Sequence, residues 1–213
     1  NRFVGLENYK TVLGNTAFLL AVKNTLLFTM LCIPVLIIIA LLCAVALYKS
    51  KYGGIIKSAF LMPMALPAVS VALVWRILFH SQGLLNHWLG NLGIAGNDWM
   101  NTGSAFGILF ISYIWKNLGY DIVLWMAGLA GISTSIYEAA RVDGAGEVQC
   151  FFYITLPNLK SSLYTITVLS FLNSFKVFRE AYLVAGDYPH ESIYMMQHLF
   201  NNWFRAFSFD KMA

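Results

Sequence analysis

The sequence predicts an all-α integral membrane protein, a polytopic bundle of helices, on three observations. Apolar residues of the AVILMFWYC set make up 59% of the 213 residues, only 11% are charged, and the mean hydropathy is +0.66. Soluble domains are about one quarter charged. Four segments are long and apolar enough to cross a bilayer. The composition therefore excludes a disordered chain, a collagen-like fibre and an ordinary cytosolic enzyme.

Neither the charges nor the cysteines indicate a further kind of site. The net charge is +4, but the 14 Lys and Arg residues form no basic tract, so no nucleic acid partner is expected. Cys32 and Cys43 lie in an apolar run and Cys150 in a polar loop, and none has a neighbour at metal-ligand spacing. We expect no metal site, no catalytic residue and no cofactor.

The first expected span is free of charges, and the second is broken by prolines. A helix needs roughly 20 apolar residues to cross the hydrocarbon core. Residues 25–48 supply 24 residues without a charge. Residues 58–79 contain Pro63 and Pro67, whose freed carbonyls neighbouring helices can satisfy inside a bundle. The sequence therefore predicts one charge-free span and one broken span.

The third and fourth expected spans, residues 103–132 and 156–184, carry charges at membrane depth. These charges are Lys116 and Asp121 in the third span and Lys176 and Arg179 in the fourth. A charge at that depth costs a few kcal/mol unless it is paired or hydrated, so it marks a functional candidate. The fourth span's two cations are expected to extend toward the outer interface.

Lysine and arginine in the short loops predict the orientation, because they favour the cytoplasmic side. The loop after the first span carries Lys49, Lys51 and Lys57, and the loop after the third carries Arg141 and Lys160. The loop of residues 81–101 has neither residue type. The first and third loops are therefore expected in the cytoplasm and the second outside.

Two outer segments, residues 84–92 and 193–207, are expected to be helices in the membrane interface. The second repeats aromatic and aliphatic residues at helical spacing, and the first does so in miniature around Trp88. An aromatic belt that anchors the bundle explains both.

The loop of residues 135–159 is the most informative segment. Ser135 and Glu138 have capping-box spacing, which predicts a short helix over residues 136–143. Gly144 then supplies a stop, since glycine adopts the left-handed conformation without a Cβ penalty. Pro157 lies where the first turn of the fourth span accepts it. The expected structure is a short helix, a sharp turn and a second helix.

This loop resembles the EAA loop of permeases from binding-protein-dependent ABC importers, above all the sugar-type permeases such as those for maltose and multiple sugars. The matching positions are Glu138, Ala139, Ala140, Asp143, Gly144, Ala145, Phe151, Ile154, Thr155, Leu156 and Pro157. Weaker similarity extends along the chain, through Phe3–Tyr9, Asn24–Leu26, Gly83–Asn86, Leu92–Ile94 and residues 192–213.

The resemblance implies a type I ABC importer fold and a location in a bacterial or archaeal inner membrane. By this similarity, residues 1–213 are a single permease domain, a fragment that lacks the first and last helices of a six-helix core. The EAA loop, about residues 133–160, would contact an ABC ATPase. A second permease, expected to form a heterodimer with this chain, and an extracytoplasmic solute-binding protein would complete the importer. The residues that resemble the ATPase-coupling positions are Glu138, Ala139, Ala140, Asp143, Gly144, Ala145, Leu156 and Pro157. The chain has no phosphate-binding loop, which fits ATP hydrolysis by a partner.

A polar stripe is the candidate solute pathway. Tyr113, Asn117, Tyr120 and Asp121 recur on one helical face of the third span. Hydroxyls, an amide and a carboxylate beside aromatic rings suit sugar recognition. The fourth span adds a milder stripe of Thr167, Ser170, Asn173 and Ser174. Hydrogen bonds between helices explain such stripes equally well.

Three other functions remain open. An intramembrane enzyme lacks support because all four histidines lie in outer segments and no hydrolase motif is present. A secondary transporter or channel would use an ion gradient instead of ATP. An importer of glycerol phosphate or another anion could use Lys116 and Lys176, although lysine lacks the bidentate geometry of arginine.

Overall fold

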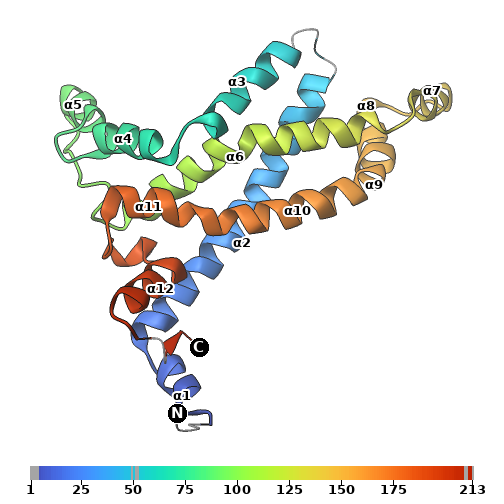
Figure 1. The fold of residues 1–213 in the computed structure, drawn as a ribbon. Coiled ribbons are helices and arrows are strands. Elements are labelled where there is room, and N and C mark those ends of the chain that lie inside the picture. The colour runs from blue at the N-terminus through green and yellow to red at the C-terminus, as the bar shows by residue number, and fades with distance from the viewer. Residues whose placement is uncertain (1–4, 49, 51–52, 209–210, 213) are drawn as a thin grey trace. The chain divides into compact units, whose positions relative to one another are not determined.

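The computed structural model describes residues 5–48, 50, 53–208 and 211–212, and every regular element in this part of the chain is helical (Figure 1). The fold class predicted from the sequence is confirmed. Phe3, Val4, Lys49 and Lys51, used above for the resemblance and the orientation, lie outside the described residues, as do positions 209, 210 and 213.

The elements are α1 Glu7–Leu13, α2 Thr16–Tyr48, α3 Gly53–Ala65, α4 Ala68–Phe79, α5 Leu84–Asn91, α6 Ser104–Ala130, α7 Thr134–Val142, α8 Glu147–Cys150, η1 Phe151–Thr155, α9 Leu156–Asn158, α10 Lys160–Ser174, η2 Phe175–Val177, α11 Phe178–Ala185, η3 Glu191–Ile193 and α12 Met196–Arg205.

The chain forms two compact units. Residues 1–31, 66–113 and 175–213 make the first unit, and residues 32–65 and 114–174 make the second. Helices α2 and α6 are each continuous and contribute residues to both units. The loop that resembles the EAA loop lies wholly in the second unit.

Among the described residues, two helices, or three with a bent pair, are long and apolar enough to cross a membrane, where four spans were expected. Two of the expected spans are interrupted. Within the described residues, α2 and the segment Ala68–Asn91 are long and apolar enough to cross a membrane. Helix α6 provides a third span if it is counted with α7, into which it bends by 67°. The second expected span breaks between α3 and α4 at Pro67, as the prolines predict.

The interruption of the fourth span was not predicted. Helix α10 ends at Ser174, and the 3₁₀ turn Phe175–Val177 separates it from α11. The Ser174 hydroxyl donates to the Phe171 carbonyl at 2.7 Å, only three residues back. A side chain that competes for a backbone carbonyl at this point favours the tighter turn.

The core of the second unit lies where α2, α6 and α10 meet. Its buried residues are Ile33, Ile37, Ala40, Leu41, Ala44 and Leu47 of α2, Ile122, Trp125, Leu129 and Ile132 of α6 and the segment after it, and Leu159 and Ile166 near and in α10. The Trp125 side chain is fully buried, and its Nε1–H donates to the Ile37 carbonyl at 3.2 Å. The indole nitrogen is therefore satisfied inside the apolar core.

Small residues let α6 approach its neighbours closely. A Cβ at Gly119 would overlap the backbone carbonyl of Phe60 in α3. A Cβ at Gly128 would overlap the Ser162 hydroxyl of α10 and lie 2.9 Å from the Leu159 Cδ2 atom. Packing between membrane helices depends on such small residues because no hydrophobic effect drives helices together in lipid.

In the first unit, α12 is held against the N-terminal half of α2. Ala21 packs with Leu199 and Trp203. The Thr25 hydroxyl accepts the backbone N–H of Met196 at 3.1 Å, at the first residue of α12. The predicted helices around residues 84–92 and 193–207 are confirmed as α5 and α12.

The segment between α4 and α6, in the first unit, is organised by one amide. Asn86 Nδ2 donates to the carbonyl of Asn97 at 2.7 Å and to that of Ser81 at 2.9 Å. Its Oδ1 accepts the indole N–H of Trp99 at 2.7 Å and the backbone N–H of Asn97 at 3.1 Å. Since the side chain is buried, its donors and acceptor hold together a segment that has little regular structure of its own.

We predict that Gly119→Ala destabilises the protein, whereas Gly107→Ala, elsewhere in α6, does not. The first methyl would collide with a backbone carbonyl, and nothing lies within 4 Å of the second. Overpacking of this kind costs about 1–3 kcal/mol, and an unobstructed alanine in a helix is neutral or favourable. Thermal unfolding in detergent measures the difference. Equal melting temperatures for the two variants would show that α6 and α3 do not approach this closely.

Candidate functional site

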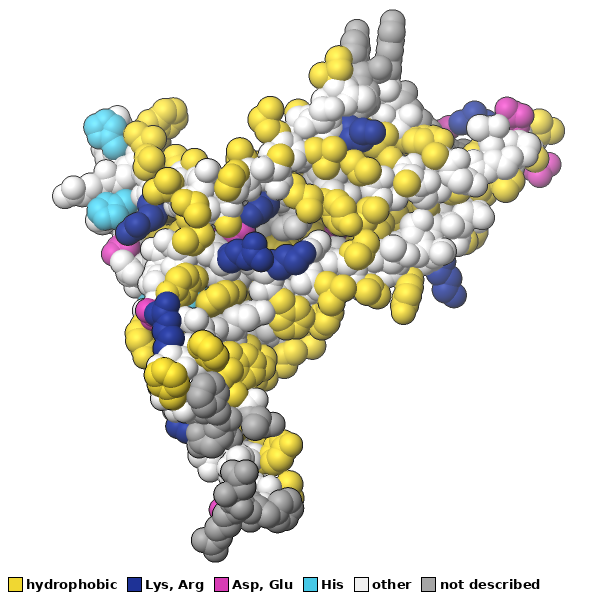
Figure 2. All heavy atoms as spheres, viewed as in Figure 1, with side chains coloured by type: hydrophobic (Ala, Val, Ile, Leu, Met, Phe, Trp, Pro, Cys, Tyr) yellow, Lys and Arg dark blue, Asp and Glu magenta, His cyan; other side chains and the backbone are white. Residues whose placement is uncertain are grey.

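Helix α7 stands out from the second unit as an exposed element. None of its residues is buried, and only Tyr137 and Ala140 are partly covered. Figure 2 shows acidic and basic side chains gathered at this end of the molecule, where Glu138, Arg141 and Glu147 are exposed. A short helix that buries so little surface is only marginally stable by itself. Its stability therefore depends on the hydrogen bonds at its ends and on its few side-chain contacts.

The start of α7 differs from the prediction. The helix begins at Thr134 with Ser133 before it, so Ser135 lies inside the first turn and cannot cap it. The Ser135 hydroxyl instead bonds that of Ser133, with 2.7 Å between the oxygens. The capping box between Ser135 and Glu138 was a wrong prediction. The Glu138 side chain is left exposed beside the pocket described below.

The end of α7 confirms the predicted glycine stop. Gly144 has φ +85°, in the left-handed region. Its N–H donates to the Arg141 carbonyl at 3.1 Å, and the Ala145 N–H donates to the Ala140 carbonyl at 2.9 Å. This is the Schellman pair of hydrogen bonds. The helix therefore ends, and the chain reverses its direction, within a single turn from Ala140 to Ala145.

The return to the membrane is irregular. After α8, residues Phe151–Thr155 form a π-turn, in which the Leu156 N–H donates to the Phe151 carbonyl five residues back. Pro157 follows within the first turn of α9, as predicted. Cys150 lies in α8 and is buried.

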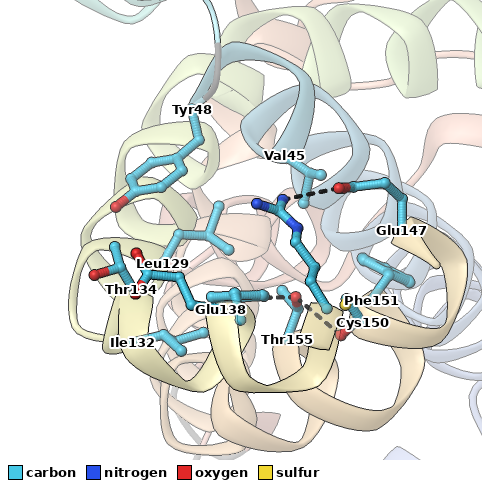
Figure 3. Close-up of a pocket in the computed structure, with 12 residues that line it drawn as sticks. Val45, Tyr48, Leu129, Ile132, Thr134, Glu138, Glu147, Cys150, Phe151 and Thr155 are labelled. Carbon is cyan, nitrogen blue, oxygen red and sulfur yellow. Dashed lines mark hydrogen bonds and ion pairs between the residues drawn. The ribbon is translucent and has the colours of Figure 1, made fainter. Parts of the chain in front are cut away.

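A pocket of about 270 Å³ lies within the second unit, under α7 (Figure 3). Its lining comes from the ends of α2 and α6, from α7, and from α8 and the π-turn: Val45, Tyr48, Leu129, Ile132, Thr134, Tyr137, Glu138, Arg141, Glu147, Cys150, Phe151 and Thr155. Most of the lining is apolar, and Glu138, Arg141 and Glu147 add charged side chains to it.

Two polar contacts cross this pocket. Arg141 donates to the Glu147 carboxylate at 2.8 Å, but both side chains are more than half exposed, so this ion pair contributes little. The Tyr137 and Thr155 hydroxyls lie 2.8 Å apart, and Thr155 is buried. Sequence reasoning missed both contacts, because the partners in each are separated by a turn whose geometry was not known.

The residues of the predicted solute pathway differ in how far they are buried. Asp121 is 1% exposed and accepts a hydrogen bond from Ser170 at 2.9 Å. Tyr113, in the first unit, is buried edge-on against Phe28 with 5.4 Å between ring centres. The positions with partial exposure are Asn117, Tyr120 and Asn173, whereas Ser174 is buried.

No metal-binding arrangement is present among the residues that the structure describes, since no three His, Cys, Asp or Glu side chains come together there. Helix α7 offers an exposed surface, and the chain joins it to the spans that contain α6 and α10.

Residues 36–202 match the family described as the inner membrane component of binding-protein-dependent transport systems. The chain belongs to this family. The match includes the whole segment from α7 to α10 and most of both units. A membrane location and the predicted kinship with importer permeases are thereby confirmed.

Two curated relatives belong to sugar transport systems. The arabinooligosaccharides transport system permease protein AraP of Bacillus subtilis is 35% identical over 189 residues, 85% of this chain and 59% of the relative. The sulfoquinovosyl glycerol transport system permease protein SmoG of Agrobacterium fabrum is 33% identical over 193 residues, 89% of this chain and 63% of the relative. This family member therefore spans less than two thirds of either relative's length.

A solved structure confirms the fold. A chain of a bacterial ABC transporter involved in the import of the acidic polysaccharide alginate superimposes with a TM-score of 0.86, covering 99% of this chain and 76% of that one. The two sequences are 22% identical, so the likeness concerns the fold alone. The predicted type I importer permease architecture is thus confirmed for this chain.

Proposed function

We propose that this chain is the membrane-spanning subunit of an ATP-driven importer, in which it forms part of the pathway for a sugar. Its proposed partners are ABC ATPase subunits, a second permease, a solute-binding protein outside the cell and the lipid bilayer. The chain itself would have no catalytic role, because ATP would be hydrolysed by the ATPase. Family membership and the names of the two relatives support this assignment.

One observation carries the coupling part of the proposal, namely the exposure of α7 between two membrane helices. Glu138 and Ala139 are exposed, and the Ala140–Ala145 turn presents Gly144 to open space, where an added Cβ would meet nothing within 4 Å. A helix that the described chain leaves largely uncovered is suited to insert into a partner. Glu138, Ala139, Ala140, Asp143, Gly144 and Ala145 are the proposed ATPase contacts, and Leu156 and Pro157 are proposed to join that contact to the span.

We predict that Gly144→Asp abolishes ATP-driven uptake by the assembled importer while the permease still inserts. The left-handed position costs a side chain about 1–2 kcal/mol, and the chain itself offers no clash, so a larger loss would come from the partner's surface. ATP-dependent uptake into proteoliposomes measures this.

The same loop provides a matched control for this substitution. Gly146→Asp adds the same side chain at φ −76°, before α8, where aspartate is a favourable cap. This variant should keep most uptake. Parental uptake with Gly144→Asp would contradict a role for this turn in coupling.

We predict that positions 50 and 146 face the cytoplasm and position 91 faces outside, from the lysine asymmetry of the loops. Single cysteines replacing Ser50, Gly146 or Asn91 all lie at exposed positions. In a chain whose three native cysteines are replaced by alanine, an impermeant thiol reagent should label only position 91 in intact cells. Labelling of positions 50 and 146 from outside would invert the topology and remove the ATPase contact.

We predict that Asn117 and Tyr120 contact the solute. Both lie on the polar face of α6 and are partly exposed. Replacing both by leucine should lower uptake at least tenfold, since each lost hydrogen bond is worth about 1 kcal/mol, without changing assembly. Tyr164→Leu, at a tyrosine of α10 that is 74% exposed, is the control. If the double variant transports like the parent, the stripe only joins helices.

A further inference from the structure

The connection between α7 and the spans passes through very few atoms. Tyr137 and Ala140 are the most covered residues of α7, and Tyr137 also packs against the apolar core of the second unit. The Arg141–Glu147 ion pair is exposed on both sides and contributes about 0–1 kcal/mol. A displacement of α7 can reach the membrane helices through the backbone that joins them. Among side-chain contacts, it reaches them mainly through Tyr137.

The hydroxyl of Tyr137 bonds a specific point of the fourth span. Thr155 has one hydroxyl proton, which it donates to the Cys150 carbonyl at 3.3 Å. The bond of 2.8 Å between the two hydroxyls must then be donated by Tyr137. Thr155 is buried, so this bond is protected from water, which would otherwise compete for it.

Thr155 is the last residue of the π-turn, and the turn has a local cause. In an α-helix, the ring of Pro157 would collide with the carbonyl four residues back, that of Tyr153. The wider π-turn before Pro157 avoids this collision, and the Leu156 N–H bonds Phe151 instead. A π-turn holds an extra residue, so its loss or shift would rotate the helix that follows by about 100°, the angle per residue.

Both the following helix and the space beside the turn suit such a motion. Helix α10 carries Ser170, which holds Asp121 of α6. The pocket of about 270 Å³ is lined by Tyr137, Phe151 and Thr155. Close-packed interiors resist rearrangement, whereas this pocket gives the tyrosine and the turn unfilled space beside them.

We propose that the Tyr137–Thr155 hydrogen bond is the positioning link through which movement of α7 changes the π-turn and so turns α10. This proposal rests on the proposed function, in which an ATPase moves α7. Tyr137 and Thr155 act through the helix and touch neither solute nor nucleotide.

The test uses the complete importer in proteoliposomes and counts solute molecules imported per ATP hydrolysed. Tyr137→Phe and Thr155→Val each remove one hydroxyl and keep the shape of the side chain. We expect each to lower the solute-to-ATP ratio about fivefold, the factor that corresponds to one hydrogen bond of about 1 kcal/mol, while ATP hydrolysis changes less than twofold. The double variant should be no worse than either single variant, because both remove the same bond.

Matched variants separate the bond from general damage. Thr155→Ser keeps the hydroxyl and should restore the parental ratio. Tyr153→Phe removes a hydroxyl from the same π-turn, at a side chain that is 80% exposed, and should have no effect. A purely structural role would lower the amount of assembled importer and leave the ratio per complex unchanged.

The outcomes distinguish the two proposals. A parental solute-to-ATP ratio in both Tyr137→Phe and Thr155→Val, or equal falls in uptake and hydrolysis, overturns the link and leaves the importer assignment intact. Absence of any ATP-dependent uptake by the unsubstituted importer overturns the proposed function itself.

Discussion

The antiparallel contact between α6 and α10 constrains everything else in the second unit. Two pairs define it, Gly128 with Ser162 and Asp121 with Ser170. The first pair is seven residues later on α6 and eight residues earlier on α10 than the second, as antiparallel helices in register require. A buried carboxylate needs a partner in a membrane, and the glycine permits the close approach that brings that partner within reach. With α10 fixed in this register, its N-terminal end brings the π-turn and Thr155 under α7.

The loop shows which features a sequence can specify locally. Gly144 was predictable because the left-handed end of a helix strongly favours glycine, whatever surrounds it. The start of α7 was not, because Ser133, Thr134 and Ser135 can all serve as caps. The choice among them depends on how the chain leaves α6, where it bends by 67°. That bend is a tertiary property, and no local pattern reports it.

The fourth span likewise has one feature that the sequence predicted and one that it did not. Pro157 was correctly placed in a first helical turn, because its missing N–H is tolerated there. The widening before it, over Phe151–Thr155, was not predicted. Proline gives a reason for a distortion but does not decide its form. The last residue of the widened turn, Thr155, also bonds the Tyr137 hydroxyl from 18 residues earlier in the chain, a contact that no local pattern reports.

The polar stripe of α6 illustrates how one pattern can serve two purposes. Periodicity placed Asn117, Tyr120 and Asp121 on one face, and hydrogen bonding between helices or a solute pathway explained the face equally well. Asp121 is 1% exposed and bonded to Ser170, so it could reach a solute only if the contact between α6 and α10 opened. Opening it would leave a carboxylate in an apolar surrounding, at a cost of several kcal/mol. Asn117 and Tyr120 retain exposed surface without any such opening. The physical demands therefore divide the stripe. The carboxylate bonds α10 and is buried, whereas the neighbouring amide and phenol keep exposed surface, which their proposed role as solute contacts requires.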